Sequence, residues 1–358
     1  MKAGRFVIDT HVHAQRFAAG AAVKESMAGK ESEAKGAGGG RWSTLSHVMN
    51  QLSPYDNSER LLYDMDCYGV DMGVLLPAFG MTNELNLKLV EKYPDRFVAT
   101  CNIDEYAKRI LAGEDEWSIE GVCNELDRLL ATGKFVGIGE VAPYMPLPHE
   151  AMRPVTREET INNLLAICEV ADRYNVTVGY HTGAPMGYDA AYSMGNLGSM
   201  TYNPLWVHDL ASSFPNLKII LDHGGVQAWW SEDFYQDCLQ VAASRDNVFL
   251  ETGLWWRELY TKPLMDPNIG PEKLIWGTDW GASINFQTQL DSYPPSYAVQ
   301  LRKKGPSHHQ TDYWGWSLRE ITAVRMSQDD RNLILGGNAC RIFGIEPPLH
   351  RLFREPNL

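Results

Sequence analysis

The chain of 358 residues lacks any apolar run of the roughly 18 to 20 residues that a membrane-spanning helix needs. Its N-terminal stretch, MKAGRFVIDTHVH, also lacks the apolar segment of a signal peptide. Basic residues are in the minority, since 32 lysines and arginines face 45 acidic residues and leave a net charge of −13. Because such a surface repels phosphate backbones and anionic lipids, we expect no nucleic-acid or membrane partner. A cytoplasmic protein is expected.

Closely spaced cysteines are missing as well. The six cysteines lie far apart, mostly inside apolar segments, and no CxxC motif occurs. This spacing disfavours both disulfides and a cysteine-ligated metal. We therefore expect buried free thiols in a reducing compartment.

Eight short apolar runs recur along the chain, with helical patterns between them. They span residues 6–13, 72–78, 97–103, 135–141, 176–182, 217–224, 248–253 and 273–279. Near-continuous apolar runs are typical of parallel strands buried on both faces. No GxGxxG follows the first run, so the pattern favours a (β/α)8 TIM barrel over its alternative, an open doubly wound sheet. Helices are expected at 57–68, 83–92, 120–131 and 157–174, the last with Thr156 as its N-cap.

The domain organisation follows from the spacing of these runs. At about 150 residues per domain, the length alone would suggest two or more domains. No repeat or shift in composition marks a boundary, so we expect one metal-dependent barrel domain over residues 1–358. Two segments interrupt the regular spacing, 14–56 after the first strand and the aromatic-rich 280–320 after the eighth. Both follow the carboxyl end of a strand, so both are predicted to be loop insertions over the mouth where barrel enzymes hold their active sites.

Five of the predicted strands end in residue types that bind metals. The first ends in an HxH motif, and alternate residues of a strand share a side, so His11 and His13 can share one ion. The other four strand ends carry Glu140, His181, His223 and Asp279. Each of these residues alone is more often a hydrogen-bonded core residue, because burying such a group without a partner is costly. Six of them at the same end of five strands indicate a metal site.

These motifs resemble the amidohydrolase superfamily, and more narrowly its amidohydrolase-related branch, which includes aminocarboxymuconate-semialdehyde decarboxylase. The matching stretches are VIDTHVH, GYHTG around His181, LDHGG around His223, LIWGTDWG around Asp279, and ILGGNACRIFGI at 334–345. The resemblance spans nearly the whole chain and identifies no substrate. It implies a barrel enzyme that uses one or two divalent metal ions, with zinc, manganese and iron as the candidates.

Glu140, in VGIGEV, separates this chain from the mononuclear decarboxylases of that branch, which generally lack a ligand on strand four. A carboxylate can bridge two cations roughly 3.5–4 Å apart. The resemblance implies one metal held by His11, His13 and Asp279, a second held by His181 and His223, and Glu140 as their bridge. The alternative is a Glu140 that only hydrogen-bonds His11 or His181. In the bridged site, a metal-activated hydroxide would attack a carbonyl, and Asp279 would relay the proton to the leaving group.

Four residues are candidates for substrate contacts. Arg16 lies three residues after the HxH motif, within reach of a substrate carboxylate, although an ordinary surface arginine is as good an interpretation. Trp255 and Trp280 follow strands seven and eight, as does Trp256. They can wall an apolar pocket, and packing between loops explains them comparably well.

Three further polar residues receive a structural interpretation. Glu251 ends strand seven and faces the mouth, where we expect it to pair with a neighbouring arginine. His308 and His309 lie within the 280–320 insertion, where an exposed loop position is favoured over a ligand role.

The favoured hypothesis is a metal-dependent hydrolase of a small organic substrate, working at a binuclear site. The second is a mononuclear non-oxidative decarboxylase or hydratase. The third is a dinuclear iron or manganese–iron oxygenase, because four histidines and two carboxylates suit iron and manganese as well as zinc. A noncatalytic partner subunit is the fourth, and the complete ligand set argues against it. The aromatic-rich insertion is compatible with a homo- or hetero-oligomer.

Overall fold

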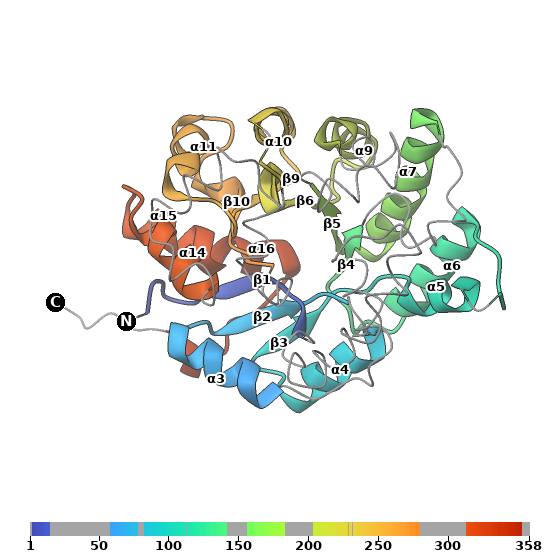
Figure 1. Ribbon diagram of the computed structural model, residues 1–358, viewed down its shortest axis with the longest axis horizontal. Coiled ribbons are helices and arrows are strands. Elements are labelled where there is room, and N and C mark those ends of the chain that lie inside the picture. Colours follow the sequence, from blue (N-terminus) through green and yellow to red (C-terminus); the bar gives the residue numbers. More distant parts are fainter. Residues whose placement is uncertain are drawn as a thin grey trace, which may run out of the picture.

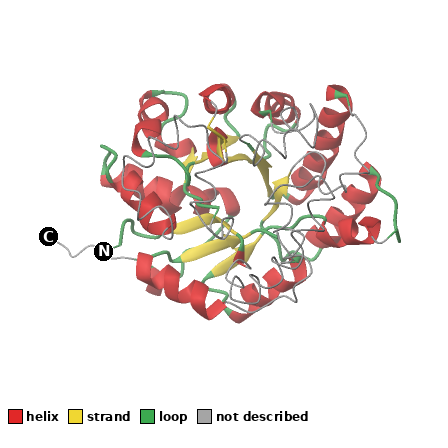
Figure 2. Cartoon of the chain, viewed as in Figure 1, coloured by secondary structure: helices red, strands yellow, loops and turns green. Residues whose placement is uncertain are grey.

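The computed structural model describes residues 2–14, 58–77, 82–111, 113–141, 156–182, 203–227, 229–230, 232–279 and 313–352. In this part of the chain, eight parallel strands surround a centre and helices lie outside them (Figures 1 and 2). The strands are β1 (Ile8–Val12), β2 (Met72–Leu75), β3 (Phe97–Ala99), β4 (Gly137–Val141), β5 (Thr177–His181), β6 (Ile219–Asp222), β9 (Val248–Glu251) and β10 (Leu274–Ile275). All eight predicted strands are confirmed, and each is shorter than the apolar run that indicated it.

The strands form a closed barrel. Continuous pairing gives the orders β1-β2-β3 and β10-β9-β6-β5-β4, all parallel. Backbone hydrogen bonds span both remaining seams. Cys101 N–H donates to Gly137 O at 2.9 Å after β3, and Thr10 N–H of β1 donates to Trp276 O at 3.0 Å after β10. The predicted (β/α)8 topology is therefore confirmed and the open sheet is excluded.

The helices follow the strands in sequence. They are α3 (Ser58–Tyr68), α4 (Asn83–Lys92), α5 (Asp104–Leu111), α6 (Ile119–Leu130), α7 (Arg157–Tyr174), α9 (Val207–Ser213), α10 (Glu232–Ser244), α11 (Thr261–Met265), α14 (Tyr313–Thr322), α15 (Gln328–Asn332) and α16 (Asn338–Phe343). The predicted α7 is confirmed at both ends, and Thr156 Oγ1 accepts the Glu159 N–H at 3.1 Å as an N-cap. A short antiparallel pair that was not predicted, β7 (Val226–Gln227) and β8 (Trp229–Trp230), follows β6. Among the described helices, none is long and apolar enough to cross a bilayer.

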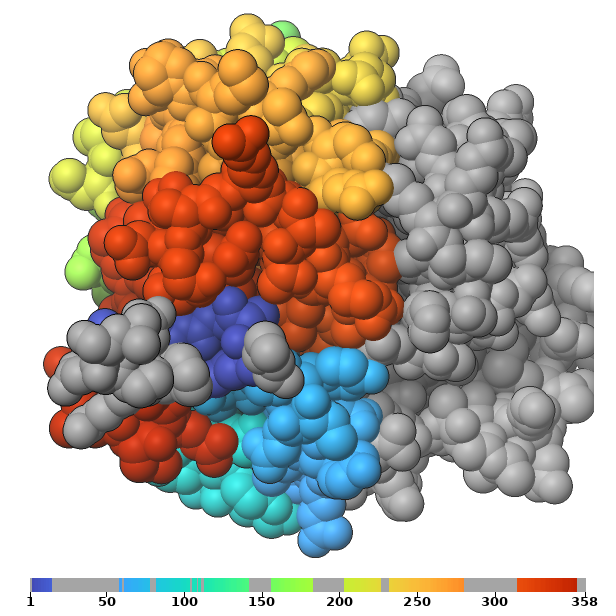
Figure 3. Space-filling model, turned by 90° about the vertical axis from the view of Figure 1, so that its left-hand side faces the viewer, coloured from blue at the N-terminus to red at the C-terminus, as the bar shows by residue number. Residues whose placement is uncertain are grey.

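The two predicted insertions lie largely outside the described residues. The exception is 313–320, which belongs to α14 and is helical, so the prediction of a loop up to residue 320 was wrong there. Trp314 and Trp316 explain the difference, because both are buried in the core and their helix therefore packs against the barrel. In the space-filling view, the C-terminal segment, coloured orange-red to red, lies beside the exposed N-terminal residues, coloured dark blue (Figure 3).

The apolar core has two layers. The larger cluster fills the space between the strands and the surrounding helices. A smaller cluster fills the barrel interior near the amino ends of the strands and consists largely of Phe6, Ile8, Met72, Val74, Leu76, Ile220, Phe249 and Ile275, packed against Ile342 and Phe343 of α16. All six cysteines are free thiols as expected, but only Cys101, Cys168 and Cys238 are buried, while Cys123 and Cys340 are half-buried and Cys67 is exposed.

Candidate metal centre

A bulge in β1 turns its two histidines toward the barrel centre. Between Asp9 and Val12, β1 has one residue more than β2 opposite it. Ile8 packs in the inner cluster and Val12 in the outer one, although regular alternation would place both on one face. Because the extra residue shifts the alternation, His11 and His13 both reach the interior at the carboxyl end.

A bulge of the same kind occurs in β4. Between Ile138 and Val141 it has one residue more than β5 opposite. Both of these side chains pack in the outer cluster, so the extra residue leaves Glu140 free to face the centre.

Two further strand ends rely on left-handed backbone. His223 follows β6 with φ 63°, and Asp279 lies beyond β10 with φ 53°. Among the described residues other than glycine, only Asn175, the C-cap of α7, shares this conformation. Left-handed backbone costs such residues roughly 1–2 kcal/mol. The strain therefore falls on residues whose side chains enter the site, as is common at functional sites.

The HxH motif and Asp279 form one compact group. His11 Nε2 and His13 Nε2 lie 3.1 Å apart. Asp279 Oδ1 lies 3.4 Å from His13 Nε2 and 3.8 Å from His11 Nε2. All three side chains are buried. This group has the composition of a metal site with two imidazoles and one carboxylate.

Glu140 connects this group to the other two histidines. Its Oε1 contacts His181 Nδ1 and lies 2.9 Å from His223 Nε2. Its Oε2 faces the other way, 3.9 Å from His11 Nε2. The structure thus brings all six predicted ligand residues together at the carboxyl ends of the strands.

The donor set fits a divalent metal. Backbone carbonyls and carboxylates can only accept hydrogen bonds, so His13 Nδ1–H donates to Leu76 O at 3.2 Å and His11 Nδ1–H donates to Glu251 at 3.1 Å. In the neutral rings, both Nε2 atoms then present lone pairs to each other at 3.1 Å, inside a buried site. Facing lone pairs repel unless a cation, either a proton or a metal ion, lies between or beside them. Imidazole and carboxylate ligands suit zinc, manganese and iron alike.

The electrostatics also favour a cation. Burial works against ionisation of Glu140, yet the neighbouring His181 holds its pKa well below the usual value. Burial likewise opposes ionisation of Asp279, and the hydrogen bond from His13 and the charge of His11 lower its pKa. In turn, burial opposes a charge on His11, but Glu251 raises its pKa well above the ordinary value. Buried, ionised carboxylates thus create a negative potential that attracts positive charge to the site.

Glu251 is the functional residue whose role the sequence missed. Among the described residues, its partners are histidines and a threonine and not the expected arginine. Its oxygens accept from His11 Nδ1–H at 3.1 Å, from the His223 backbone N–H at 2.9 Å and from Thr10 Oγ1 at 3.3 Å. The signal available was its position, since it ends β9 just as the candidate ligands end their own strands.

Asp9 supports the site from outside the barrel. Its carboxylate accepts hydrogen bonds from the His11 N–H at 3.0 Å, the Thr278 N–H at 2.9 Å and Trp314 Nε1–H at 2.5 Å. Burial raises the pKa of Asp9 to about 6. The residue fastens the end of β1 to α14 and to the residue that precedes Asp279.

The predicted substrate contacts are the weakest part of the sequence interpretation. Trp255 is fully buried, donates from Nε1 to His223 O at 3.2 Å, and packs edge-on against Tyr235 and Tyr260. It supports His223 from behind and does not wall an open pocket, because its ring is enclosed by these neighbours. Arg16, Trp280, His308 and His309 lie outside the described residues.

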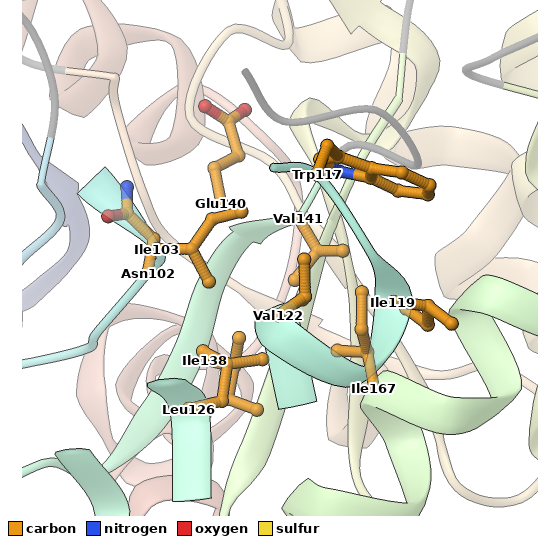
Figure 4. Close-up of a pocket in the computed structure, with 10 residues that line it drawn as sticks. All are labelled: Asn102, Ile103, Trp117, Ile119, Val122, Leu126, Ile138, Glu140, Val141 and Ile167. Carbon is orange, nitrogen blue, oxygen red and sulfur yellow. The ribbon is translucent and has the colours of Figure 1, made fainter. Parts of the chain in front are cut away.

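An apolar pocket adjoins the site on the helix side of β4. Its cavity volume is about 30 Å³, and its lining comprises Asn102, Ile103, Trp117, Ile119, Val122, Leu126, Ile138, Glu140, Val141 and Ile167. Figure 4 shows the Glu140 carboxylate pointing away from Ile138, Leu126 and Ile167. Glu140 therefore contributes its stem to this pocket and its oxygens to the histidine cluster.

Comparison with known proteins assigns the family. The amidohydrolase family model matches residues 8–345. The chain belongs to the amidohydrolase family. The resemblance predicted from the motifs is therefore confirmed, and the chain is a metal-dependent enzyme of this family. No curated protein matches the amidohydrolase chain.

Solved structures share the fold of this amidohydrolase. One is 5-carboxyvanillate decarboxylase from Novosphingobium aromaticivorans, complexed with manganese and 4-hydroxy-3-methoxy-5-nitrobenzoic acid. It is 15% identical over 96% of this chain and 97% of that chain, with a TM-score of 0.56. Another is a probable 2-pyrone-4,6-dicarboxylic acid hydrolase from Acinetobacter baumannii with citric acid bound, 15% identical over 95% and 99% of the two chains, with a TM-score of 0.49. At this identity, the likeness to the decarboxylase concerns the barrel fold and not the reaction.

Proposed function

We propose that this protein is a metal-dependent hydrolase of a small organic substrate, with a binuclear centre at the carboxyl end of the barrel. One observation carries the proposal: the two oxygens of Glu140 face two different sets of histidines. A single-metal reaction has no need of such a carboxylate, whereas a two-metal site needs a ligand that reaches both ions.

Each candidate ligand has a defined place in this proposal. His11, His13 and Asp279 would hold the first ion, His181 and His223 would hold the second, and Glu140 would be shared between them. Bound divalent cations lower the pKa of a coordinated water, so that hydroxide is available near neutral pH. The imidazole lone pairs then have to face the ions. Glu251 and the Leu76 carbonyl ensure this, because they accept from His11 Nδ1–H and His13 Nδ1–H and so leave each Nε2 free of a proton.

Asp279 is the proposed proton carrier. Its lowered pKa keeps the carboxylate ionised at neutral pH and able to accept a proton from the attacking water. The water oxygen bonds to the carbonyl carbon, the bond from that carbon to the leaving group breaks, and Asp279 returns the proton to the leaving group. Water is thus added across one bond with no change in oxidation state.

The test is a product analysis on the full chain loaded separately with zinc, manganese and iron. Small esters, lactones and amides are incubated in ¹⁸O-labelled water, and mass spectrometry follows the products. Hydrolysis places one labelled oxygen in the acid product, with no carbon dioxide release and no oxygen uptake. Glu140→Gln should reduce turnover at least about 100-fold, because loss of even an outer partner of a ligand costs 10–100-fold. Glu84→Gln, an exposed carboxylate of α4, is the matched control and should behave as wild type.

Other results would favour the competing reactions. Carbon dioxide release from an aromatic carboxylate, undiminished in Glu140→Gln, would indicate the mononuclear decarboxylase. Turnover only with iron and a reductant, at one dioxygen consumed per product, would indicate the oxygenase. Either outcome contradicts the hydrolase.

A further inference from the structure

The geometry points to Glu251 as a positioning residue that serves both halves of the metal centre at once. This inference rests on the two-metal site proposed above and adds a residue that is not itself one of the six candidate ligands. Glu251 is 1% exposed and lies at the end of β9, between His11 and His223.

The two oxygens of Glu251 divide between the two halves. Its Oε1 lies 3.3 Å from Thr10 Oγ1 and 3.2 Å from His11 Nδ1. Its Oε2 lies 3.1 Å from His11 Nδ1 and accepts the His223 backbone N–H at 2.9 Å. His223 Nδ1 lies 3.4 Å from the same oxygen and has no other hydrogen-bond partner among the described residues. One carboxylate therefore holds a ligand of each proposed ion.

The barrel interior is shaped to admit this side chain. Gly277 follows β10 beside Glu251, and a Cβ at that position would overlap both Glu251 Oε1 and Thr10 Oγ1. Any larger residue at position 277 would displace the carboxylate from its partners. The position of the Glu251 carboxylate therefore requires glycine at residue 277.

The contacts have a direct consequence for metal binding. A carboxylate that accepts from Nδ1–H fixes the ring tautomer and leaves the Nε2 lone pair for a metal. The bond to the His223 backbone N–H also holds the left-handed turn that aims this ring at Glu140. Loss of the acceptor should consequently weaken both ions and not just one.

Two variants of similar size distinguish the role of Glu251 as a hydrogen-bond acceptor from its role in filling space. In Glu251→Gln, the amide oxygen can take the place of Oε2 and accept from both histidines, while its NH2 group faces Thr10 Oγ1. In Glu251→Leu, the space remains filled but no acceptor is left. The glutamine variant should therefore retain the geometry with weaker, uncharged hydrogen bonds, and the leucine variant should lose it.

The experiment is a titration of the metal-free full chain with Co²⁺, followed by visible absorption and calorimetry. Wild type should take up two equivalents. Glu251→Leu should weaken both equivalents by about 10- to 100-fold. Glu251→Gln should weaken both by less than about tenfold, with unchanged Co²⁺ band positions, since the residue is not itself a ligand. Asp71→Asn, a buried carboxylate paired with Lys2 far from the centre, is the control and should leave both affinities unchanged.

The outcomes separate this inference from the function on which it rests. Uptake of a single equivalent by wild type would overturn the binuclear site. Two equivalents in wild type, with wild-type affinities in both variants, would overturn the role of Glu251 alone. Loss confined to one equivalent would show that Glu251 serves one half only. Should Glu251→Leu fail to fold by circular dichroism, the glutamine variant decides, because weakening of only one equivalent contradicts the inference.

Discussion

The two ends of this barrel are built from the same strands and have opposite chemistry. At the amino end, Ile8, Ile220, Phe249 and Ile275 fill the interior and pack against α16. At the carboxyl end, the interior holds buried histidines and carboxylates, among them His11, His13, Glu251 and Asp279, beside the half-buried Glu140 and His181. In Figure 1, α16 lies close to β1. The comparison shows that burial alone does not mark a stabilising region. Burial of apolar side chains stabilises the fold at the amino end, whereas burial of ionisable side chains at the carboxyl end is destabilising.

Single strands contribute both to the apolar amino end and to the polar carboxyl end. β6 places Ile220 in the apolar cluster and leads three residues later to His223. β9 likewise places Phe249 in that cluster and ends in Glu251. If the ends are independent, a change at one should leave the other intact, and this is open to test.

The largest effect is expected from His11→Ala. His11 Nε2 lies 3.1 Å from His13 Nε2 and 3.9 Å from Glu140 Oε2, so it is a proposed ligand of the first ion and a neighbour of the proposed bridge. Its removal should weaken the first ion by more than about 100-fold, since a ligand matters more than its outer partner. Elemental analysis after gel filtration would measure this. Retention of two ions per chain would exclude His11 as a ligand.

A core truncation at the amino end should lower stability and leave metal binding unchanged. Ile220→Ala removes a buried side chain from the inner cluster and should lower the free energy of unfolding of the metal-free chain by about 2–5 kcal/mol. Chemical denaturation measures the loss, and the variant should still bind metal as wild type does. A drop in metal affinity comparable to that of His11→Ala would show that the two ends are coupled.

The smallest effect is expected from Trp255→Phe, at the carboxyl end but behind the ligands. The change removes the 3.2 Å hydrogen bond from Trp255 Nε1 to the buried His223 carbonyl, which keeps its bond from Val226 N–H, and should cost about 1 kcal/mol of stability. Thermal unfolding with and without metal would reveal it. Unchanged stability together with altered substrate affinity would restore Trp255 to the pocket wall that the sequence suggested.

The sequence predicts the barrel well because its signals are local. An apolar run marks each strand, and Thr156 marks the start of α7 through a contact with a residue only three positions away. The convergence of the six candidate ligands also follows, because parallel strands end at one edge. Their role as ligands stays a prediction, as do the single domain and the oligomeric state.

What the sequence could not supply depends on neighbours distant in the chain. The bulges in β1 and β4 are defined only by the registers of β2 and β5. The partners of Glu251 lie 240 positions away at His11 and 28 positions away at His223, so no local pattern reveals them. The helix over residues 313–320 is fixed by tryptophans that pack against the barrel.

Metal content, measured in the full chain and in Glu140→Gln, tests the central claim most directly. Elemental analysis of protein purified without chelators should give two divalent ions per wild-type chain. The glutamine variant should retain fewer ions, because its amide offers one oxygen where two bound ions would each need one. No bound metal in wild type, or a single ion retained equally by both proteins, would contradict the binuclear centre.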